Sequence, residues 1–411
     1  MANKIKTKTT IFNDPIYGFI SIPYDIIQTL IEHKYFQRLR RIKQLGLTHL
    51  VYPGAYHTRF QHAMGAMHLT GLAIDVLRSK GNSISNEEAE GVSIAILLHD
   101  IGHGPFSHAL EKSIVSNVNH EDLSVIFMES LNREYKGKLT LAIKIFKNKY
   151  RKKFLHQLVA SQLDMDRLDY LNRDSFFAGV SEGIISSDRI IKMLNIKNDQ
   201  LVVDAKGIYS IEKFLIARRL MYWQVYLHKT VVSAELLLLK ILKRAKYLYS
   251  KNHELFATPS LEYFLRNQVD KTDFEQNKAI LDEFANLDDY DLISAIKVWC
   301  NHHDKILSSL CSKLVNRKLN KVEIQGEKFK KAYIEKIKKS VLKKLKIAPG
   351  DVHYYVFSDV ISNNTYNPND DKINVLYKDG SLADVAKASD HLNISVLSRT
   401  TRKYYLCYPK M

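Results

Sequence analysis

Apolar residues recur at steps of three and four over most of the first 320 positions of the chain, a pattern that predicts amphipathic helices. The predicted helices span residues 25–45, 61–80, 87–100, 120–131, 155–174, 211–250, 261–268 and 287–319. Ahead of them, the turn formers of Asn13–Gly18 stand next to an alternating Phe-Ile-Ser-Ile run, which predicts a hairpin over residues 11–24. The first part of the chain is therefore expected to be a helical bundle.

The pattern changes after Pro349 and Gly350. Residues 353–360, 372–377 and 402–408 are short runs typical of strands, and a polar turn covers residues 363–371. We therefore expect a mainly α fold with a helical domain over residues 1–346 and a small α+β C-terminal lobe over residues 347–411.

Composition is ordinary for a globular protein, with 45% hydrophobic and 26% charged residues in a chain of 411. No apolar run reaches the roughly 20 residues that a bilayer crossing needs, and the first residues lack the apolar segment of a secretory signal. The three cysteines are widely spaced. These features predict a cytoplasmic protein that makes no use of a membrane, with the cysteines in its core.

The formal net charge is +17, and much of the excess lies between Lys321 and Lys346. Apolar residues recur there at helical spacing, namely Phe329, Tyr333, Ile337 and Val341. Such a segment is interpreted either as a solvated helix face or as a strip that binds nucleotides or nucleic acid.

The densest group of polar residues follows an apolar helix, in Ile96–His108. The helix ends in the pair His99 and Asp100, and Gly102, Gly104 and Pro105 stop it. Both side chains can therefore turn into a cleft at the helix end. Imidazole and carboxylate together suit a divalent first-row metal.

Two further side chains complete a candidate metal site. His62 lies at the start of the preceding helix, and Asp166 lies in a segment that places three carboxylates among apolar residues. Alone, each has a plainer interpretation as a surface or capping residue. Together, His62, His99, Asp100 and Asp166 would leave coordination positions for water and phosphate oxygens, as metal-assisted hydrolysis requires.

These four residues match, in order and context, the H…HD…D signature of the HD-domain phosphohydrolases. The chain resembles in particular the deoxynucleoside triphosphate (dNTP) triphosphohydrolase branch of that family. The matching stretches are residues 13–18, 36–46, 52–55, 59–62, 99–108 and 226–229. The resemblance implies a helical domain with its metal site within residues 50–180, a divalent Mn, Fe, Co, Ni or Zn ion, and Mg as a candidate on the substrate phosphates.

The resemblance also implies a triphosphate pocket. Three guanidinium groups would bind phosphates, those of Arg59, Arg167 and Arg218. The deoxyribose and base would be contacted by Gln44, Leu45, Tyr170, Asp174 and Tyr226. In this chain Arg167 stands where the family pattern has a lysine, and Leu227 where it has a glutamine, which leaves the base preference open.

The implied reaction is attack by a metal-activated water on the α-phosphorus, with a histidine protonating the departing 5′-oxygen. The candidate histidines are His103, His108 and His120. The resemblance pairs His120 with the acidic residue at position 111, which is Glu111 in this chain.

Regulation by a nucleotide is a further hypothesis, because Glu32, Gln37 and Arg40 match positions that read an activating nucleotide at a subunit interface. A homotetramer is the assembly that this implies. The alternative interpretation is the polar face of a helix.

Two other functions compete with dNTP hydrolysis. One is an HD phosphohydrolase that acts on another nucleotide phosphoester. The other is a nucleic-acid-binding protein that uses the segment from Lys321 to Lys346 and carries a vestigial HD site.

Overall fold

The computed structural model describes residues 10–106, 115, 118–363, 366–367, 371–389 and 401–410. It confirms the mainly α fold. Helices of the first half are α1 (Asp25–Glu32), α2 (Lys34–Gln37), η1 (Arg38–Arg41), η2 (Gly46–Leu50), α3 (Arg59–Ser79), α4 (Asn86–Leu98), α6 (His120–Glu134), α7 (Thr140–Phe146), α8 (Lys153–Val159), α9 (Met165–Ala178), α10 (Ser187–Met193), η3 (Ala205–Gly207) and α11 (Ile208–Met221).

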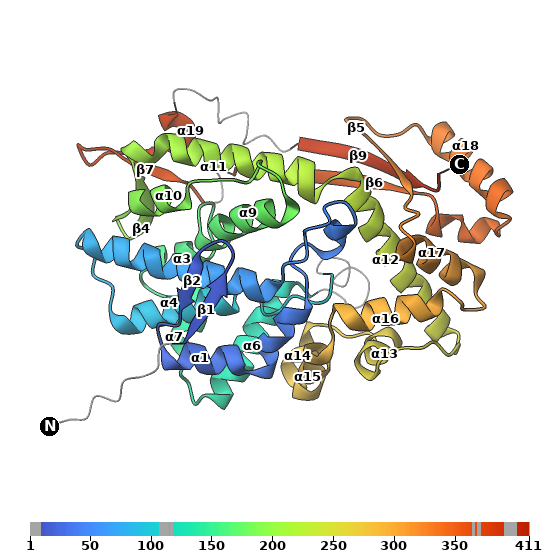
Figure 1. The fold of residues 1–411 in the computed structure, drawn as a ribbon, viewed down its shortest axis with the longest axis horizontal. Coiled ribbons are helices and arrows are strands. Elements are labelled where there is room, and N and C mark those ends of the chain that lie inside the picture. Colours follow the sequence, from blue (N-terminus) through green and yellow to red (C-terminus); the bar gives the residue numbers. More distant parts are fainter. Residues whose placement is uncertain are drawn as a thin grey trace.

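The second half continues with η4 (Tyr222–Tyr226), α12 (Lys229–Ser250), α13 (Pro259–Arg266), α14 (Lys271–Gln276), α15 (Lys278–Asn286), α16 (Asp289–Trp299), α17 (Lys305–Val315), α18 (Lys331–Leu345), η5 (Pro349–Tyr354) and α19 (Val385–Ala388). In Figure 1 the long helix α12 descends between the elements of the first half, on the left, and α16 to α18, on the right. Among the described residues, no helix combines the length and apolar character that a membrane crossing needs.

The strands form three small sheets. The predicted hairpin is confirmed as β1 (Ile11–Asp14) paired with β2 (Gly18–Ser21). A second sheet has the order β3-β4-β7-β8, from β3 (Leu194–Lys197), β4 (Gln200–Asp204), β7 (Asn374–Leu376) and β8 (Leu382–Asp384). A third has the order β5-β9-β6, from β5 (Lys321–Gln325), β9 (Thr401–Tyr408) and β6 (Phe357–Asn363).

Several expected helices are interrupted, so the prediction of single helices over 25–45, 155–174, 211–250 and 287–319 was wrong. In each case a polar side chain caps a new helix inside the apolar pattern. His33 accepts the backbone N–H of Tyr35, and Asp304 accepts that of Leu307. In the region 211–250, a turn of π-helix (η4) separates α11 from α12.

The expected strand at 353–360 begins later, because η5 occupies its first residues and β6 starts at Phe357. Strands on either side of residue 347 share sheets, since β7 pairs with β4 and β9 pairs with β5. The boundary of a C-terminal lobe at residue 347 stays a prediction.

A continuous apolar core runs from Ile20 through Tyr408. The helices that matter for the candidate site are α3, α4 and α9, and α3 packs against both of the others. The buried faces of α3 and α4 are mostly apolar, whereas the buried face of α9 also carries Asp169, Arg173 and Asp174.

Candidate metal centre and adjoining pocket

Three of the four predicted metal ligands converge. Nε2 of His62 lies 3.0 Å from Oδ1 of Asp166, and Nε2 of His99 lies 3.5 Å from the same oxygen. One candidate ligand atom from each of the three residues lies within 4.8 Å of the others. The structure therefore brings together His62, His99 and Asp166 in a group that could hold a metal ion.

The ends of three helices place these side chains. Thr58 and Gln61 form a capping box that starts α3 and puts His62 in its first turn. His99 is the C-terminal cap of α4, and Asp164 caps α9 so that Asp166 lies in the first turn of α9. Because helix ends leave their side chains free to turn into a cleft, three ends meeting at one point produce a polar site inside an apolar bundle.

The two imidazoles present acceptor nitrogens to this point. Nδ1 of His62 donates to Oδ2 of Asp169 at 2.7 Å, and Nδ1 of His99 donates to the carbonyl oxygen of Ile96 at 2.6 Å. Both Nε2 atoms are buried without a hydrogen-bond partner. A proton held on Nδ1 leaves the Nε2 lone pair for a metal, so the donor set fits a divalent first-row ion.

Asp100, the fourth predicted ligand, lies beside this group. Its Oδ1 is 3.4 Å from Nε2 of His99, and its Oδ2 is 3.8 Å from Nε2 of His62. The guanidinium of Arg59 donates to Oδ2 of Asp100. Asp100 therefore faces the site with one oxygen already engaged by a residue that was predicted to bind phosphate.

The charged groups of the centre shift one another's pKa values. Burial alone would raise the pKa of Asp166, but the neighbouring His62 and His99 hold that pKa well below its usual range. Burial lowers the pKa of His62, yet Asp166 and Asp169 outweigh it and raise the pKa to about 10. The carboxylates therefore attract positive charge to this point, whether protons on the imidazoles or a metal ion.

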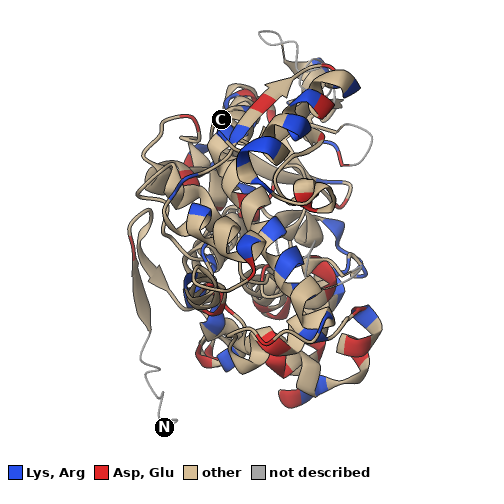
Figure 2. Ribbon diagram, turned by 90° about the vertical axis from the view of Figure 1, so that its right-hand side faces the viewer, with Lys and Arg blue, Asp and Glu red and all other residues tan. Residues whose placement is uncertain are grey.

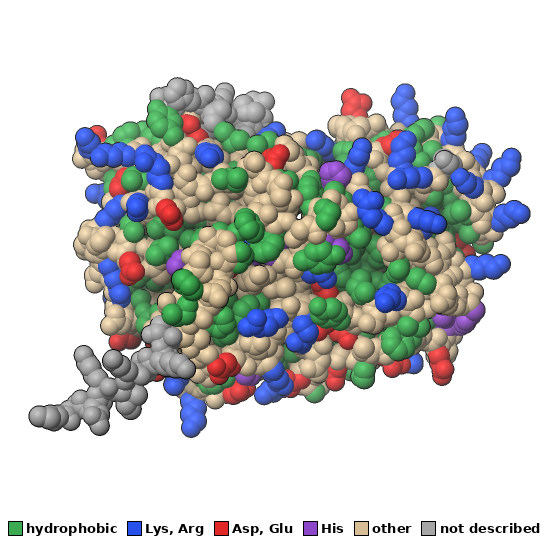
Figure 3. Space-filling model, viewed as in Figure 1, with side chains coloured by type: hydrophobic (Ala, Val, Ile, Leu, Met, Phe, Trp, Pro, Cys, Tyr) green, Lys and Arg blue, Asp and Glu red, His purple; other side chains and the backbone are tan. Residues whose placement is uncertain are grey.

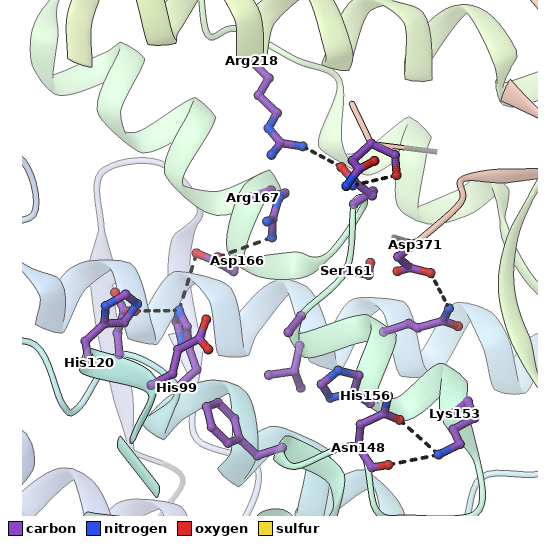
Figure 4. A pocket seen from close by; sticks show the side chains of 18 of the residues that line it. His99, His120, Asn148, Lys153, His156, Ser161, Asp166, Arg167, Arg218 and Asp371 are labelled. Carbon is purple, nitrogen blue, oxygen red and sulfur yellow. Dashed lines mark hydrogen bonds and ion pairs between the residues drawn. The ribbon is translucent and has the colours of Figure 1, made fainter. Parts of the chain in front are cut away.

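A cavity of about 1030 Å³ opens beside the centre. Figure 4 shows His99, Asp166 and His120 at one end and Asn148, Lys153 and His156 at the other. Arg167 and Arg218 line the same cavity and lie above Asp166 in this view. His99, Asp100 and Asp166, three of the four candidate metal ligands, thus border one space with two of the predicted phosphate-binding arginines.

The two arginines retain unused donors. Nη1 of Arg218 donates to Oε1 of Gln162 at 3.2 Å, and Nη1 of Arg167 donates to Asp164. The Nε atoms of both guanidinium groups are buried without a hydrogen-bond partner. Buried donors of this kind favour an anionic ligand, because an unpaired buried N–H is costly.

The residues predicted to hold the sugar form a cluster of their own. Tyr226 donates to Oδ2 of Asp174 at 2.7 Å, and the rings of Tyr170 and Tyr226 lie 6.2 Å apart. Nε2 of His57 lies 2.7 Å from Oδ1 of Asp174, and its ring stacks on Phe177. Sequence reasoning brought these tyrosines and Asp174 together but gave no role to His57.

Gln44 and Leu45 lie in the segment between η1 and η2, where the backbone N–H of Gln44 donates to the carbonyl of His57 at 3.0 Å. Oε1 of Gln44 is buried without a hydrogen-bond partner. Among the described residues, the lining of the large cavity includes neither these two nor the sugar cluster. The predicted base and sugar contacts thus do not line this cavity, although Tyr170 lies near enough to Arg167 and Arg218 to interact with their charges.

Of the candidate proton donors, His103 is buried and its ring stacks on His120 with centroids 3.9 Å apart. Its Nδ1 lies 3.3 Å from Oδ1 of Asp100, and His120 lines the cavity. Burial and the nearby Arg59 lower the pKa of His103 to about 3. The other two predicted residues, His108 and Glu111, lie outside the described residues.

The predicted effector residues lie away from the cavity. Gln37 donates to the carbonyl of Ile31 at 2.7 Å and accepts from Nε of Arg40 at 2.9 Å. The Arg40 guanidinium is 3.6 Å from the ring centroid of Phe60, and Glu32 is exposed at the end of α1. These contacts allow the interpretation as a polar surface and leave the effector site a prediction.

Comparison with known proteins identifies the family. Residues 59–174 match the model of the HD domain, and residues 185–255 match that of the HD associated region. The chain is 33% identical to YwfO of Bacillus subtilis, an uncharacterized protein, over 97% of this chain and 92% of that protein. The chain belongs to the HD-domain phosphohydrolases.

Two other relatives of this HD-domain protein carry more specific names. A phosphohydrolase of Bacteroides thetaiotaomicron has a solved structure that superposes with a TM-score of 0.95 at 53% identity, covering 98% of this chain and 100% of that one. The deoxynucleoside triphosphate triphosphohydrolase SAMHD1 homolog of Dictyostelium discoideum is 32% identical over 57% of this chain and 49% of its own. The matched HD segment contains all four predicted metal ligands.

Proposed function

We propose that this HD phosphohydrolase converts dNTPs and water to the deoxynucleoside and inorganic triphosphate. The observation that supports it most is the shared cavity, in which Arg167 and Arg218 keep buried unpaired donors beside Asp166 and His99. A triphosphate carries several negative charges, and planar guanidinium groups match its oxygens. The similarity to the Dictyostelium dNTP triphosphohydrolase supports the same substrate class.

His62, His99, Asp100 and Asp166 would hold the metal. When bound, a divalent cation supplies a water of lowered pKa and neutralises charge on phosphate oxygens. A water oxygen then bonds to the α-phosphorus while the bond from phosphorus to the 5′-oxygen breaks. A histidine gives the departing 5′-oxygen its proton, and His103 and His120 are the described candidates. The pKa of His103, lowered to about 3 by burial and Arg59, favours His120 for this role.

The sugar cluster would select the deoxynucleoside. Asp174, already fixed by His57 and Tyr226, would accept a hydrogen bond from the 3′-hydroxyl. Tyr170 would pack against C2′ and leave no room for a ribose hydroxyl. Gln44, whose Oε1 is buried and unpaired, and Leu45 would contact the sugar and base.

Incubation of the full chain with Mn²⁺ and each dNTP and rNTP, alone and in mixtures, tests this function by product separation. We expect deoxynucleoside and triphosphate in equal amounts. The rate of turnover should fall at least 100-fold in Asp166→Ala, because a metal ligand is removed. The rate should be unchanged in Glu335→Ala, a substitution at an exposed position of α18. Release of orthophosphate or pyrophosphate instead would contradict attack at the α-phosphorus. Turnover of only another phosphoester would favour the competing HD phosphohydrolase.

The same assay addresses regulation. We propose that a nucleotide at Glu32, Gln37 and Arg40 activates a homotetramer, on the resemblance of these positions and on the mutual hydrogen bond of Gln37 and Arg40. Turnover that appears only in dNTP mixtures, and falls in Arg40→Ala, is the expected result. Equal turnover of single dNTPs and mixtures would contradict activation.

A second candidate function, nucleic-acid binding, is favoured by one observation. Most lysines of α18 and its flanks are exposed, and Figure 3 shows lysine and arginine side chains projecting at the upper right of the molecule, where α18 lies. This surface is separate from the metal centre. Binding there is therefore compatible with an active HD site.

A further inference from the structure

The turn motif Asn13–Gly18 has no part in the proposed reaction, yet its acidic residue is buried. Asp14 is 8% exposed, and its Oδ1 accepts the backbone N–H groups of Ile16 and Tyr17 at 2.9 and 3.1 Å. These bonds shape the turn between β1 and β2. The second oxygen, Oδ2, points away from the turn and accepts from Nη1 of Arg173 at 2.8 Å.

Arg173 joins this turn to α9. Its side chain is fully buried. The guanidinium donates two parallel hydrogen bonds of 2.9 Å to Asp169, from Nε to Oδ2 and from Nη2 to Oδ1. Paired bonds of this kind fix the plane of the carboxylate as well as its position. The guanidinium therefore uses one edge for Asp169 and its remaining nitrogen for Asp14.

Asp169 in turn holds a predicted metal ligand. Its Oδ2 accepts from Nδ1 of His62 at 2.7 Å, while Nε2 of the same ring faces Asp166. A carboxylate behind a metal-binding imidazole sets its tautomer, orients the ring and raises its basicity. Asp14, Arg173, Asp169 and His62 thus form one buried chain from the hairpin to the metal centre.

The buried chain holds two carboxylates and one guanidinium, since Asp14 and Asp169 both accept from Arg173. The excess negative charge favours a cation at the inner end of the chain, beside His62. Since buried charges interact strongly, removal of the Asp14 carboxylate would weaken the negative electrostatic field at the inner end of the chain. It would also leave Arg173 with an unused hydrogen-bond donor.

We propose that the hairpin helps to position a ligand of the metal centre. Asp169 positions His62, and Asp14 of the hairpin positions Asp169 through Arg173. The inference rests on the metal site of the proposed function and not on the identity of the substrate. Because coupling is reciprocal, cation binding then orders the hairpin just as the hairpin strengthens cation binding.

The test measures Mn²⁺ affinity of the metal-stripped full chain by calorimetry. Asp14→Asn keeps the Oδ1 acceptor for the turn and removes the charge that faces Arg173. We expect Asp169→Asn to weaken Mn²⁺ binding about 10- to 100-fold, and Asp14→Asn about 3- to 30-fold. Asp25→Asn, at an exposed position at the start of α1, is the matched control and should bind as the unmodified chain does.

The first part of a second readout uses the unmodified chain and therefore requires no variant to fold. Hydrogen exchange of residues 11–21 should slow when Mn²⁺ is added to the unmodified chain, and this protection should shrink in Asp14→Asn. Unchanged exchange of the hairpin, or Mn²⁺ affinity in a folded Asp14→Asn equal to that of Asp25→Asn, overturns the proposal. If the expected affinities are found but no dNTP is hydrolysed, the proposed function fails and the coupling stands.

Discussion

At the scale of single residues, the contact between α3 and α9 depends on Gly65. A Cβ at this position would lie 2.0 Å from Oδ1 of Asp169 and 2.2 Å from Nη2 of Arg173. Neither atom can move away, because both belong to fully buried side chains that bind each other. We therefore predict that Gly65→Ala destabilises the protein by about 1 to 3 kcal/mol, the cost of overpacking a core.

Gly71 supplies the control on the same helix, since a Cβ there meets nothing within 4 Å. Gly71→Ala should stabilise the protein by up to about 1 kcal/mol, because alanine is the better helix former. Urea unfolding of both variants measures the difference. Equal free energies of unfolding for Gly65→Ala and Gly71→Ala would show that the helices separate easily and that the contact is not a tight one.

The residue types of the centre could be predicted from sequence, but their partners could not. His62, His99 and Asp166 were found from their order and context, and the structure groups them. The roles of Asp169 and Arg173 were missed although their spacing from Asp166 puts all three on one helix face. The contact of Asp14 with Arg173 could not be predicted, because no local sequence pattern shows which distant residue a hairpin carboxylate binds.

At the scale of elements, α4 carries His99 at one end and is fixed at the other by Glu88. This carboxylate accepts from the backbone N–H of Ser85, from Tyr150 and from Lys152. Burial alone would raise its pKa, but Lys152, Ser85 and Tyr150 together bring the pKa below its ordinary value. Glu88 therefore stabilises the fold in its ionised form.

We predict that Glu88→Gln lowers the free energy of unfolding at pH 7 by about 1 to 3 kcal/mol, as expected for hydrogen bonds to a charged group. A lowered folded-state pKa contributes stability that is present above the ordinary value of 4.5 and is lost as pH falls through the folded-state value. The difference in free energy of unfolding between the unmodified protein and Glu88→Gln should thus narrow below pH 4.5. Urea titrations at pH 7 and pH 4 measure it, with Glu90→Gln on the same helix as control. A difference in free energy of unfolding that stays constant with pH would contradict a stabilising role of the ionised carboxylate.

Helix positions were predicted better than helix ends. The apolar period continues across the breaks near residues 33, 160 and 300, so periodicity alone joins neighbouring helices into one. The hairpin of β3 and β4 was missed, although Asn198 and Asp199 provide a two-residue turn in which both residues have positive φ. Asparagine and aspartate are the residues that tolerate this conformation, and the signal was therefore present in the sequence.

At the scale of the whole molecule, the sheets join segments that are far apart in the chain. β4 pairs in parallel with β7, so Val203 lies opposite Val375. Periodicity predicts that β7 is a strand but contains no information about its partner. The predicted C-terminal lobe is consequently tied to the helical part through two sheets, which favours a molecule whose two ends unfold together.

Charge is also distributed at this scale. Figure 2 shows basic positions on the upper half of the end that carries α18 and acidic positions gathered at the lower end. Ile337 and Val341 of α18 are buried, while Lys336, Lys339 and Lys343 recur at helical steps on the solvent side and are exposed. Lys338 forms an ion pair with Glu335, and α18 forms no other ion pair with the described residues. Of the large apolar side chains of α18, Tyr333 alone is exposed, at 37%, which favours a polyanion in solution over a membrane surface.

We therefore predict that the chain binds single-stranded DNA through this helix, with affinity that falls steeply as salt increases. Reversal of Lys336, Lys339 and Lys343 to Glu should weaken binding at least 10-fold and reduce the slope of log affinity against log salt by about 2, since each phosphate contact contributes about 0.7. Gel shifts at several salt concentrations measure both quantities. The same triple reversal at the exposed Lys136, Lys138 and Lys149 controls for net charge. If both triple variants lose affinity equally, the attraction comes from overall charge, and α18 is simply a solvated face of the helical bundle.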